Sequence, residues 1–168
     1  MTKITNKATI TEDAMVTNVR NAIEHRATWM ALFLDEAEKA GQDWEQIARA
    51  AIGKCGCFHG SLISEQMKDQ TDLTEFKNLF LHDLGQKIFE MDIKELTDEK
   101  LAVEFHYCPL LSAWQKQNMS DETVEKLCDI AMDGDRGIGE SLEHFQFELG
   151  KTIAQGHPVC EIFFHKKK

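Results

Sequence analysis

The sequence predicts an α+β fold in which N-terminal helices precede an antiparallel four-stranded sheet, made of two hairpins with two helices between them. Three observations predict this class. Apolar residues recur at helical spacing as far as Leu84, but from Phe89 onward many alternate with polar residues, as in strands. Helices and strands are segregated along the chain, which is typical of α+β proteins. The parallel crossovers of a Rossmann fold are missing.

The helical half follows residues 1–10, which we expect to form a flexible arm. A long helix is predicted over residues 12–40. Asp43 starts the next helix, with a glutamine three residues later as in a capping box. Residues 53–60 hold three glycines and therefore predict a loop that breaks this helix. A further capping box starts the helix over residues 72–85, which a glycine ends.

The second half holds the strands. Pro109 suits the first position of a short helix, since its missing N–H costs nothing there. Ser120 is the predicted N-cap of the next helix, and Asp133–Gly139 is predicted to be a loop because it holds three glycines. The predicted strands span residues 87–96, 100–108, 145–149 and 159–165.

Size and charge limit the function classes. The chain of 168 residues, 42% of them hydrophobic, predicts one domain over residues 1–168, with 11–86 mainly helical and 87–165 forming the sheet and two helices. A net charge of −10 argues against nucleic acid as a partner, because phosphate binding needs clustered cations. The run Lys166–Lys168 is read as a solvated tail. A homodimer is compatible with the sequence.

No apolar stretch approaches the roughly 20 residues of a membrane-spanning helix, so no membrane is expected as a partner. Residues 1–7 are followed by no apolar segment, which predicts no secretory signal and, by default, a cytoplasmic location. In a reducing compartment the five cysteines are expected to be free thiols.

The first candidate site is the junction His106-Tyr107-Cys108-Pro109, where a predicted strand meets a helix. Residues two apart on a strand share a face, so His106 and Cys108 are expected side by side on the less apolar face. A histidine beside a cysteine lowers the thiol pKa and makes a nucleophile or a ligand. Tyr107 is a candidate substrate-binding residue. The alternative is an exposed sheet face with a half-buried cysteine.

Two further cysteine–acid pairs lie downstream, Cys128-Asp129 and Cys160-Glu161. Cys128 is on the apolar stripe of its helix and Cys160 shares a strand face with apolar residues, so both are also compatible with core packing. Glu161 is on the opposite face of the strand, between apolar neighbours, and is a candidate acid or base.

Two glycine-containing segments carry other candidates. The Cys55-Gly56-Cys57 segment with His59 raises a zinc site as an alternative, but it has no second half, and we expect neither a metal nor another cofactor. In the Asp133–Gly139 segment, Asp133 and Asp135 are candidates for a base or for hard-metal ligands, with a solvated turn as the alternative. Arg136 is a candidate carboxylate ligand, because a guanidinium matches that geometry. A surface arginine at a helix end is the alternative.

The order of these motifs resembles a known family. A strand-end cysteine in Phe105–Pro109, the helical Leu127-Cys128 with Asp135 downstream, and the last-strand segment Ala154–Phe164 resemble the bacterial L-2-amino-thiazoline-4-carboxylic acid hydrolase family. The resemblance covers residues 89–164. The last segment also resembles vinyl-reductase-type small-molecule-binding domains.

The family resemblance implies hydrolysis of a cyclic isothiourea that carries a carboxylate, giving a carbamoyl-cysteine. It carries over Cys108, Cys128, Asp135 and Cys160 as motif positions. From the chemistry of the reaction we expect Cys108 as nucleophile or ligand, His106 as base, Asp135 or Glu161 as acid–base partner, and Arg136 as carboxylate grip. The alternative function is a non-catalytic small-ligand-binding or sensor domain.

Overall fold

The computed structural model describes residues 2–168, and its centre is an antiparallel four-stranded sheet of order β1-β2-β4-β3. All three neighbouring pairs are antiparallel. The α+β class and the two hairpins are therefore confirmed. The strands are β1 (Met91–Leu96), β2 (Lys100–Phe105), β3 (Phe145–Leu149) and β4 (Cys160–Lys166). A short 3₁₀ turn, η1 (Ile153–Gln155), lies between β3 and β4.

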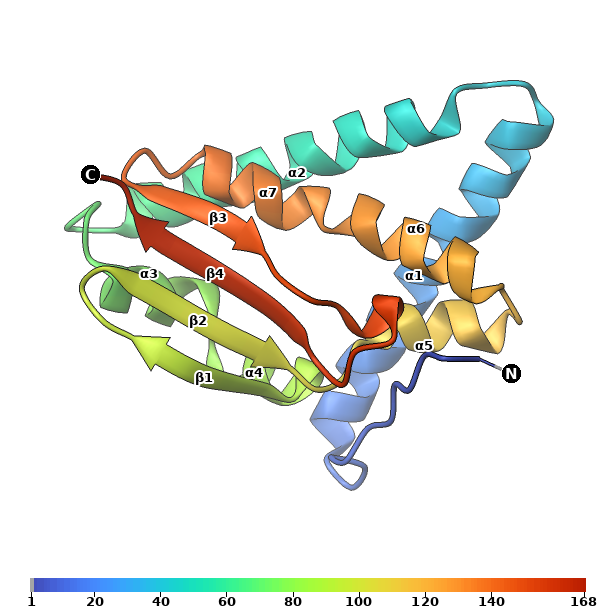
Figure 1. The fold of residues 1–168 in the computed structure, drawn as a ribbon, viewed down its shortest axis with the longest axis horizontal. Coiled ribbons are helices and arrows are strands. Elements are labelled where there is room, and N and C mark those ends of the chain that lie inside the picture. Colours follow the sequence, from blue (N-terminus) through green and yellow to red (C-terminus); the bar gives the residue numbers. More distant parts are fainter. Residues whose placement is uncertain (1) are drawn as a thin grey trace.

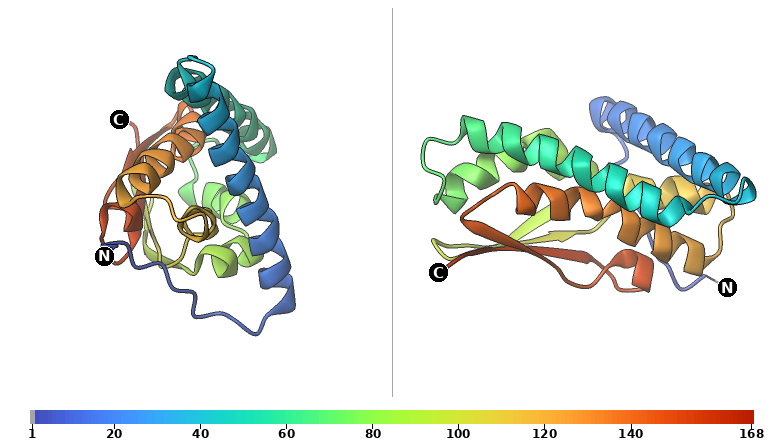
Figure 2. Two further views of the ribbon diagram at one scale, coloured as in Figure 1. Left: turned by 90° about the vertical axis from the view of Figure 1, so that its right-hand side faces the viewer. Right: turned by 90° about the horizontal axis from the view of Figure 1, so that it is seen from above.

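The helices lie on one side of this sheet (Figures 1 and 2). Four precede it: α1 (Ala14–Lys39), α2 (Trp44–Gln66), α3 (Leu73–Phe80) and α4 (Asp83–Phe89). Three lie between the hairpins: α5 (Pro109–Lys116), α6 (Asp121–Ala131) and α7 (Asp133–Glu140). Within residues 2–168, no helix is long and apolar enough to cross a membrane.

Helix starts follow the predicted capping signals. The side chains of Asp43, Asp72 and Ser120 each accept hydrogen bonds from backbone N–H groups of the first turn. Pro109 is the first residue of α5. The predicted first strand was too long at its start, because residues 87–89 belong to α4. That helix contains Gly85 and ends only at Phe89, where it is capped by Glu90, whose φ of 51° is left-handed.

Both glycine-rich segments are helical, so the predicted loops at 53–60 and 133–139 are wrong. A Cβ on Gly56 would lie 2.0 Å from the carbonyl oxygen of Gly134, and one on Gly137 would lie 2.3 Å from that of Gly53. Gly60 meets Ile138 in the same way, at 2.8 Å from its oxygen. The glycines therefore let α2 and α7 pack backbone against backbone. As a consequence three helices, not two, separate the hairpins.

The N-terminal arm, expected to be flexible, packs against the protein. Ile4 is 3% exposed and belongs to the hydrophobic core. Asn6 holds the backbone of Cys108 from both sides, since its Nδ2 donates to the Cys108 carbonyl at 2.8 Å and its Oδ1 accepts from the Cys108 N–H at 2.9 Å. The first part of the arm is therefore anchored by a buried apolar residue and by an amide.

A buried ion pair fastens the arm to α1 and α4. Arg20 donates to Glu90 at 3.0 Å and to the backbone carbonyls of Ile10, Lys87 and Ile88. Glu90 also accepts hydrogen bonds from the N–H groups of Thr9 and Ile10 and from the Thr9 hydroxyl. We call this arrangement the Arg20–Glu90 knot.

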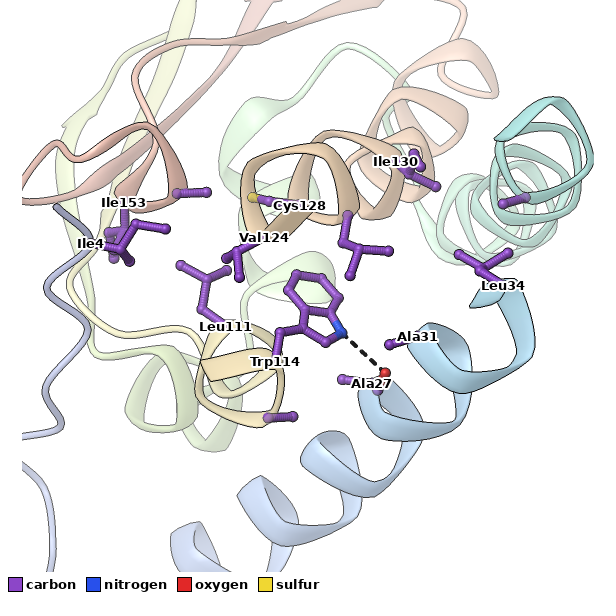
Figure 3. Packing of buried hydrophobic residues seen from close by; sticks show 14 residues of the cluster. Ile4, Ala27, Ala31, Leu34, Leu111, Trp114, Val124, Cys128, Ile130 and Ile153 are labelled. Atoms are coloured by element: carbon purple, nitrogen blue, oxygen red, sulfur yellow. Dashed lines mark hydrogen bonds between the residues drawn. The ribbon is translucent and has the colours of Figure 1, made fainter. Parts of the chain in front are cut away.

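The core has two parts. One lies between the sheet and α3, where Phe76 packs against Phe145 and Phe164 with ring centroids 5.5 and 4.7 Å apart. The other lies among α1, α5, α6 and η1, around the fully buried Trp114. The indole N–H of Trp114 donates to the carbonyl of Ala27 at 3.0 Å (Figure 3). The second part contains the cysteines of interest.

Candidate functional site

Three cysteines from three separate elements pack against one hydrophobic cluster. Cys108 is the residue before α5, Cys128 lies on α6, and Cys160 begins β4. Figure 3 shows Cys128 beside Val124, with Ile153 and Ile4 nearby in the same cluster. The charge of a Cys160 thiolate would raise the pKa of Cys108, and both would raise that of Cys128. The structure thus brings the three thiols within electrostatic reach of one another.

Asp135 joins these thiols from the first turn of α7. Its negative charge contributes to raising the pKa of both Cys108 and Cys128. Although the residue as a whole is half-buried, its carboxyl group is strongly desolvated. Desolvation raises the pKa of Asp135 to about 6, and its own N–H and the charge of Arg136 offset this only in part. We call Cys108, Cys128, Cys160 and Asp135 the cysteine–aspartate cluster.

The thiols of this cluster are held in the protonated form. Burial, followed by the charge of Cys160, raises the pKa of Cys108 to about 12, although N–H groups at the start of α5 oppose the effect. Burial raises the pKa of Cys160 to about 11, even though the Ile153 N–H donates to its Sγ at 3.2 Å. Because the thiolate is the nucleophile, resting thiols of this kind are weakly reactive.

His106 and Tyr107 do not join the cluster. The strand β2 ends at Phe105, so the alternation that predicted His106 and Cys108 on one face stops before Cys108. His106 instead lies beside the side chains of Asp92 and Glu104, with nitrogen–oxygen distances of 3.1 and 3.8 Å. Its Nε2 is buried, and the short contact with Asp92 lacks hydrogen-bond geometry.

Tyr107 is buried, and its ring packs under the Arg20 guanidinium, 4.4 Å from the ring centroid. This contact ties it to the Arg20–Glu90 knot. The predicted pair of His106 and Cys108 is therefore corrected. The motif divides at Tyr107, with one half at the surface and the other in the core.

Arg136 lies next to Asp135 in sequence, but its donors are already engaged. It donates to Asp129 at 2.7 Å and to Asp133 at 2.6 Å, as well as to the Asp129 carbonyl. Arg49 of α2 pairs with the same two carboxylates, at 2.7 and 3.1 Å. This network joins α2, α6 and α7.

Glu161 is on the outer face of β4, since its neighbour Ile162 is fully buried and faces the core. It pairs across the sheet with Glu104 and accepts a hydrogen bond from the Lys151 N–H at 3.2 Å. Strand parity therefore separates Glu161 from Cys160, as the sequence predicted. The structure does not bring Glu161 into the cysteine–aspartate cluster.

Two surface hollows lie away from this cluster. One of about 570 Å³ is lined by His106, Asp92 and Lys87, among others. The other, of about 320 Å³, lies over the junction of α2 and α7 and is lined by Arg136 and Cys57, among others. Neither is lined by Cys108, Cys128 or Cys160.

The Cys55–His59 segment is helical, which separates its side chains. Residues two apart on a helix point in nearly opposite directions, and Cys55 is exposed whereas Cys57 is half-buried near Glu140. Within the described part of the chain, no group of three or more His, Cys, Asp or Glu side chains is placed to hold a metal ion.

Sequence reasoning missed Asn6 and Arg20. Asn6 fixes the backbone of Cys108, yet a single polar residue in an N-terminal arm gives no signal of a contact 102 positions away. A signal for Arg20 existed, because it falls between Val16 and Ala27 on the buried face of α1. A charged residue on an apolar stripe needs a buried partner.

One matching solved structure shares the fold. The chain of a trafficking protein particle complex subunit 3 from Naegleria fowleri, covalently bound to palmitic acid, matches with a TM-score of 0.54 at 15% identity. The match covers 86% of this chain and 95% of that one. At this identity the likeness shows the architecture alone. The search of curated proteins gives no significant match.

A family match covers most of the sequence. The model described as L-2-amino-thiazoline-4-carboxylic acid hydrolase matches residues 20–164. The match extends from α1 to β4 and therefore includes all four residues of the cysteine–aspartate cluster. The chain belongs to the L-2-amino-thiazoline-4-carboxylic acid hydrolase family.

Proposed function

We propose that the protein is a hydrolase that opens a small cyclic amidine carrying a carboxylate, with L-2-amino-thiazoline-4-carboxylate as the first substrate to test. The family match supports this reaction class. The observation that carries the proposal is the pKa of about 6 for Asp135 among three thiols from distant elements. A base with a pKa near the working pH is well matched to proton transfer.

The reaction moves both protons of one water molecule. The oxygen of water bonds to the amidine carbon while Asp135 takes one proton from that water and passes it to the amidine nitrogen, whose π bond to carbon is lost. The ring C–N bond then breaks as the new C–OH group becomes C=O, and Asp135 carries the hydroxyl proton to the departing nitrogen. Water is consumed, no electrons are exchanged, and the product is a carbamoyl-cysteine. Asp135 thus serves first as base and then as acid.

The raised pKa of Cys108 argues against a preformed thiolate nucleophile, so the proposal assigns the attack to water with Asp135 as base. Moving a proton from a thiol of pKa about 12 to a carboxylate of pKa about 6 spans six pKa units. That difference costs roughly 8 kcal/mol before any bond forms. The three cysteines then provide a neutral, polarisable wall beside the reacting carbon. The covalent alternative requires the bound substrate to lower the pKa of Cys108.

The substrate carboxylate needs a cation. Arg136, adjacent to Asp135, takes this role in the proposal by exchanging one of its carboxylate partners, Asp129 or Asp133, for the substrate. His106 and Glu161 are left without a part in the chemistry, because both lie outside the cluster.

Product analysis tests this function. The purified protein is incubated with L-2-amino-thiazoline-4-carboxylate, and carbamoyl-cysteine is followed by mass spectrometry. We expect turnover by wild type, a loss of about 10²–10⁴-fold in kcat for Asp135→Asn, and full activity for Cys55→Ala, a variant at an exposed cysteine outside the cluster. Full activity of Asp135→Asn, or no turnover by wild type, would contradict the proposal.

A second candidate is a non-catalytic small-ligand-binding domain. Its support is the enclosure of the protonated thiols, together with the matched fold in which a palmitic acid is covalently bound. Intact-mass measurement distinguishes the two. A stable added mass that is lost in Cys108→Ala, without turnover, favours binding. The five free thiols fit a reducing compartment, and we propose a cytoplasmic location for either function.

A further inference from the structure

The outer surface of α1 and α2 is unusually apolar. Between residues 29 and 62, six large hydrophobic side chains are 40–71% exposed there, although each helix already has its inner side packed. We call them the outer patch: Trp29, Leu32 and Phe33 on α1, with Ile47, Phe58 and Leu62 on α2. Figure 2 shows these two helices as the layer farthest from the sheet.

The patch is on the sides of the helices opposite the core. On α1 the buried residues Ala27, Ala31 and Leu34 face inward. At 100° per residue, Trp29 and Phe33 point away from them. On α2 the inner side carries Gly56 and Gly60, which touch α7, and the outer side carries Phe58 and Leu62. A helix that is apolar on both sides is typical of a buried helix.

The exposed area approaches what a stable interface requires. Trp29 and Phe33 are each 71% exposed and Phe58 is 62% exposed. Since an aromatic side chain offers 150–250 Å², these three rings alone present on the order of 400 Å². That is about half of the roughly 800 Å² that each partner buries in a standard interface. The three aliphatic members of the patch add to it.

Charge argues for a protein partner over a lipid surface. The chain carries a net charge of −10, and Asp35 and Glu36 are exposed beside Phe33, so an anionic membrane would be repelled. Arg26 is exposed on the same helix and makes no ion pair with any residue from Thr2 to Lys168. It is a cation available to another molecule.

A second copy of the chain complements this arrangement. If two α1 helices pack antiparallel about a two-fold axis at the level of Ala31, Trp29 of one copy meets Phe33 of the other. The same axis brings Arg26 to the level of Glu36, because both pairs are centred on position 31. A single two-fold axis therefore forms the aromatic contacts and also gives Arg26 an acidic partner, as expected of an isologous interface.

We propose that two copies of this chain associate through the outer patch, with their α1 helices antiparallel. The interface buries the aromatic residues of α1 at its centre and places Arg26 opposite the partner's Glu36. It lies on the far side of α1 and α2 from the cysteine–aspartate cluster, so it does not depend on the proposed hydrolase activity.

The oligomeric state tests this directly. Light scattering with size-exclusion chromatography over a concentration series is expected to give twice the chain mass for wild type. Phe33→Glu should weaken association by at least about tenfold, equivalent to 1.4 kcal/mol. The matched control is Leu96→Glu, an exposed apolar position on β1 that should leave the dimer unchanged. Circular dichroism verifies that each variant is folded.

Charge exchange tests the antiparallel arrangement. Arg26→Glu should weaken the dimer, and adding Glu36→Arg in the same chain should restore it. A monomeric wild type at every concentration overturns the proposal, and so does a wild type that binds uncharged vesicles as a monomer. An intact dimer in folded Phe33→Glu overturns the outer patch as the interface. A double variant that stays weak overturns the antiparallel register.

Discussion

Two acidic residues of this protein, Glu90 and Asp135, are both removed from water but have opposite surroundings. Burial alone would raise the pKa of Glu90, but hydrogen bonds from Ile10, Thr9 and Arg20 outweigh it, so its pKa lies below the ordinary value. For Asp135, burial prevails and the pKa rises to about 6. The Arg20–Glu90 knot is fully paired, whereas the cysteine–aspartate cluster is not.

This difference separates a structural site from a chemical one. A carboxylate with every oxygen engaged holds the arm, α1 and α4 together and has no capacity left for a substrate. A carboxyl group whose ionised form lacks partners costs stability, and such groups gather where proton transfer is performed. We therefore expect Glu90 to stabilise the fold and Asp135 to transfer protons, and substitutions can test each role.

The largest expected effect is at the knot. Arg20→Met leaves Glu90 buried without its cation, and breaking a buried ion pair costs about 3–5 kcal/mol. Urea denaturation measures this loss. The control is Lys39→Met, which removes an exposed cation from its pairs with Asp35 and Glu36 and should leave stability almost unchanged. Equal effects of the two substitutions would contradict a structural role for the knot.

The next effect concerns the packing of α7, the helix that carries Asp135, against α2. Gly56→Ala places a Cβ 2.0 Å from the Gly134 oxygen, so α2 and α7 must separate, and overpacking of this kind costs about 1–3 kcal/mol. Gly53→Ala is the matched control, because its nearest contact is 3.9 Å and alanine favours a helix by up to about 1 kcal/mol. Activity should fall in the first variant and persist in the second.

The same glycines show where sequence reasoning reached its limit. The caps at Asp43, Asp72 and Ser120, the hairpins and the N-terminal helix were predicted, because each depends on neighbours within a few residues. The helices at Gly56 and Gly137 were not, because glycine is a local signal for a loop. The reason for each glycine lies in the other helix of the α2–α7 pair, some 80 positions away, whose backbone occupies the space that a side chain would fill.

The candidate site divides along a similar line. The family resemblance identified Cys108, Cys128, Asp135 and Cys160, and these are the residues that the structure brings together. Local reasoning added His106 by extending strand alternation to residue 108, beyond the end of β2 at Phe105. The bend after Phe105 depends on where α5 packs, which a local pattern does not contain.

The pH dependence of stability should distinguish the two carboxylates. Between about pH 4 and pH 6, Asp135 is still protonated in the folded protein but ionised in the unfolded chain. The free energy of unfolding therefore falls as pH rises through this window. Asp135→Asn should abolish that fall and stabilise the protein near pH 7.5 by about 1–2 kcal/mol, a value reduced for partial exposure. Glu90→Gln should instead lose stability that wild type gains as pH rises, because its pKa is lowered. Denaturation at a series of pH values measures both slopes, and parallel slopes in the two variants would refute the contrast.

The last prediction concerns the reactivity of the thiols and involves no change in the free energy of unfolding. At pH 8 a thiol of pKa about 12 holds roughly a thousandfold less thiolate than one at the ordinary value of 9. Iodoacetamide should therefore modify the exposed Cys55 long before Cys108, Cys128 or Cys160, as followed by peptide mass spectrometry. In urea all five cysteines should react at similar rates. Rapid modification of Cys108 in the folded protein would mean that its thiol is activated, and it would move the proposed chemistry from water attack to a covalent intermediate.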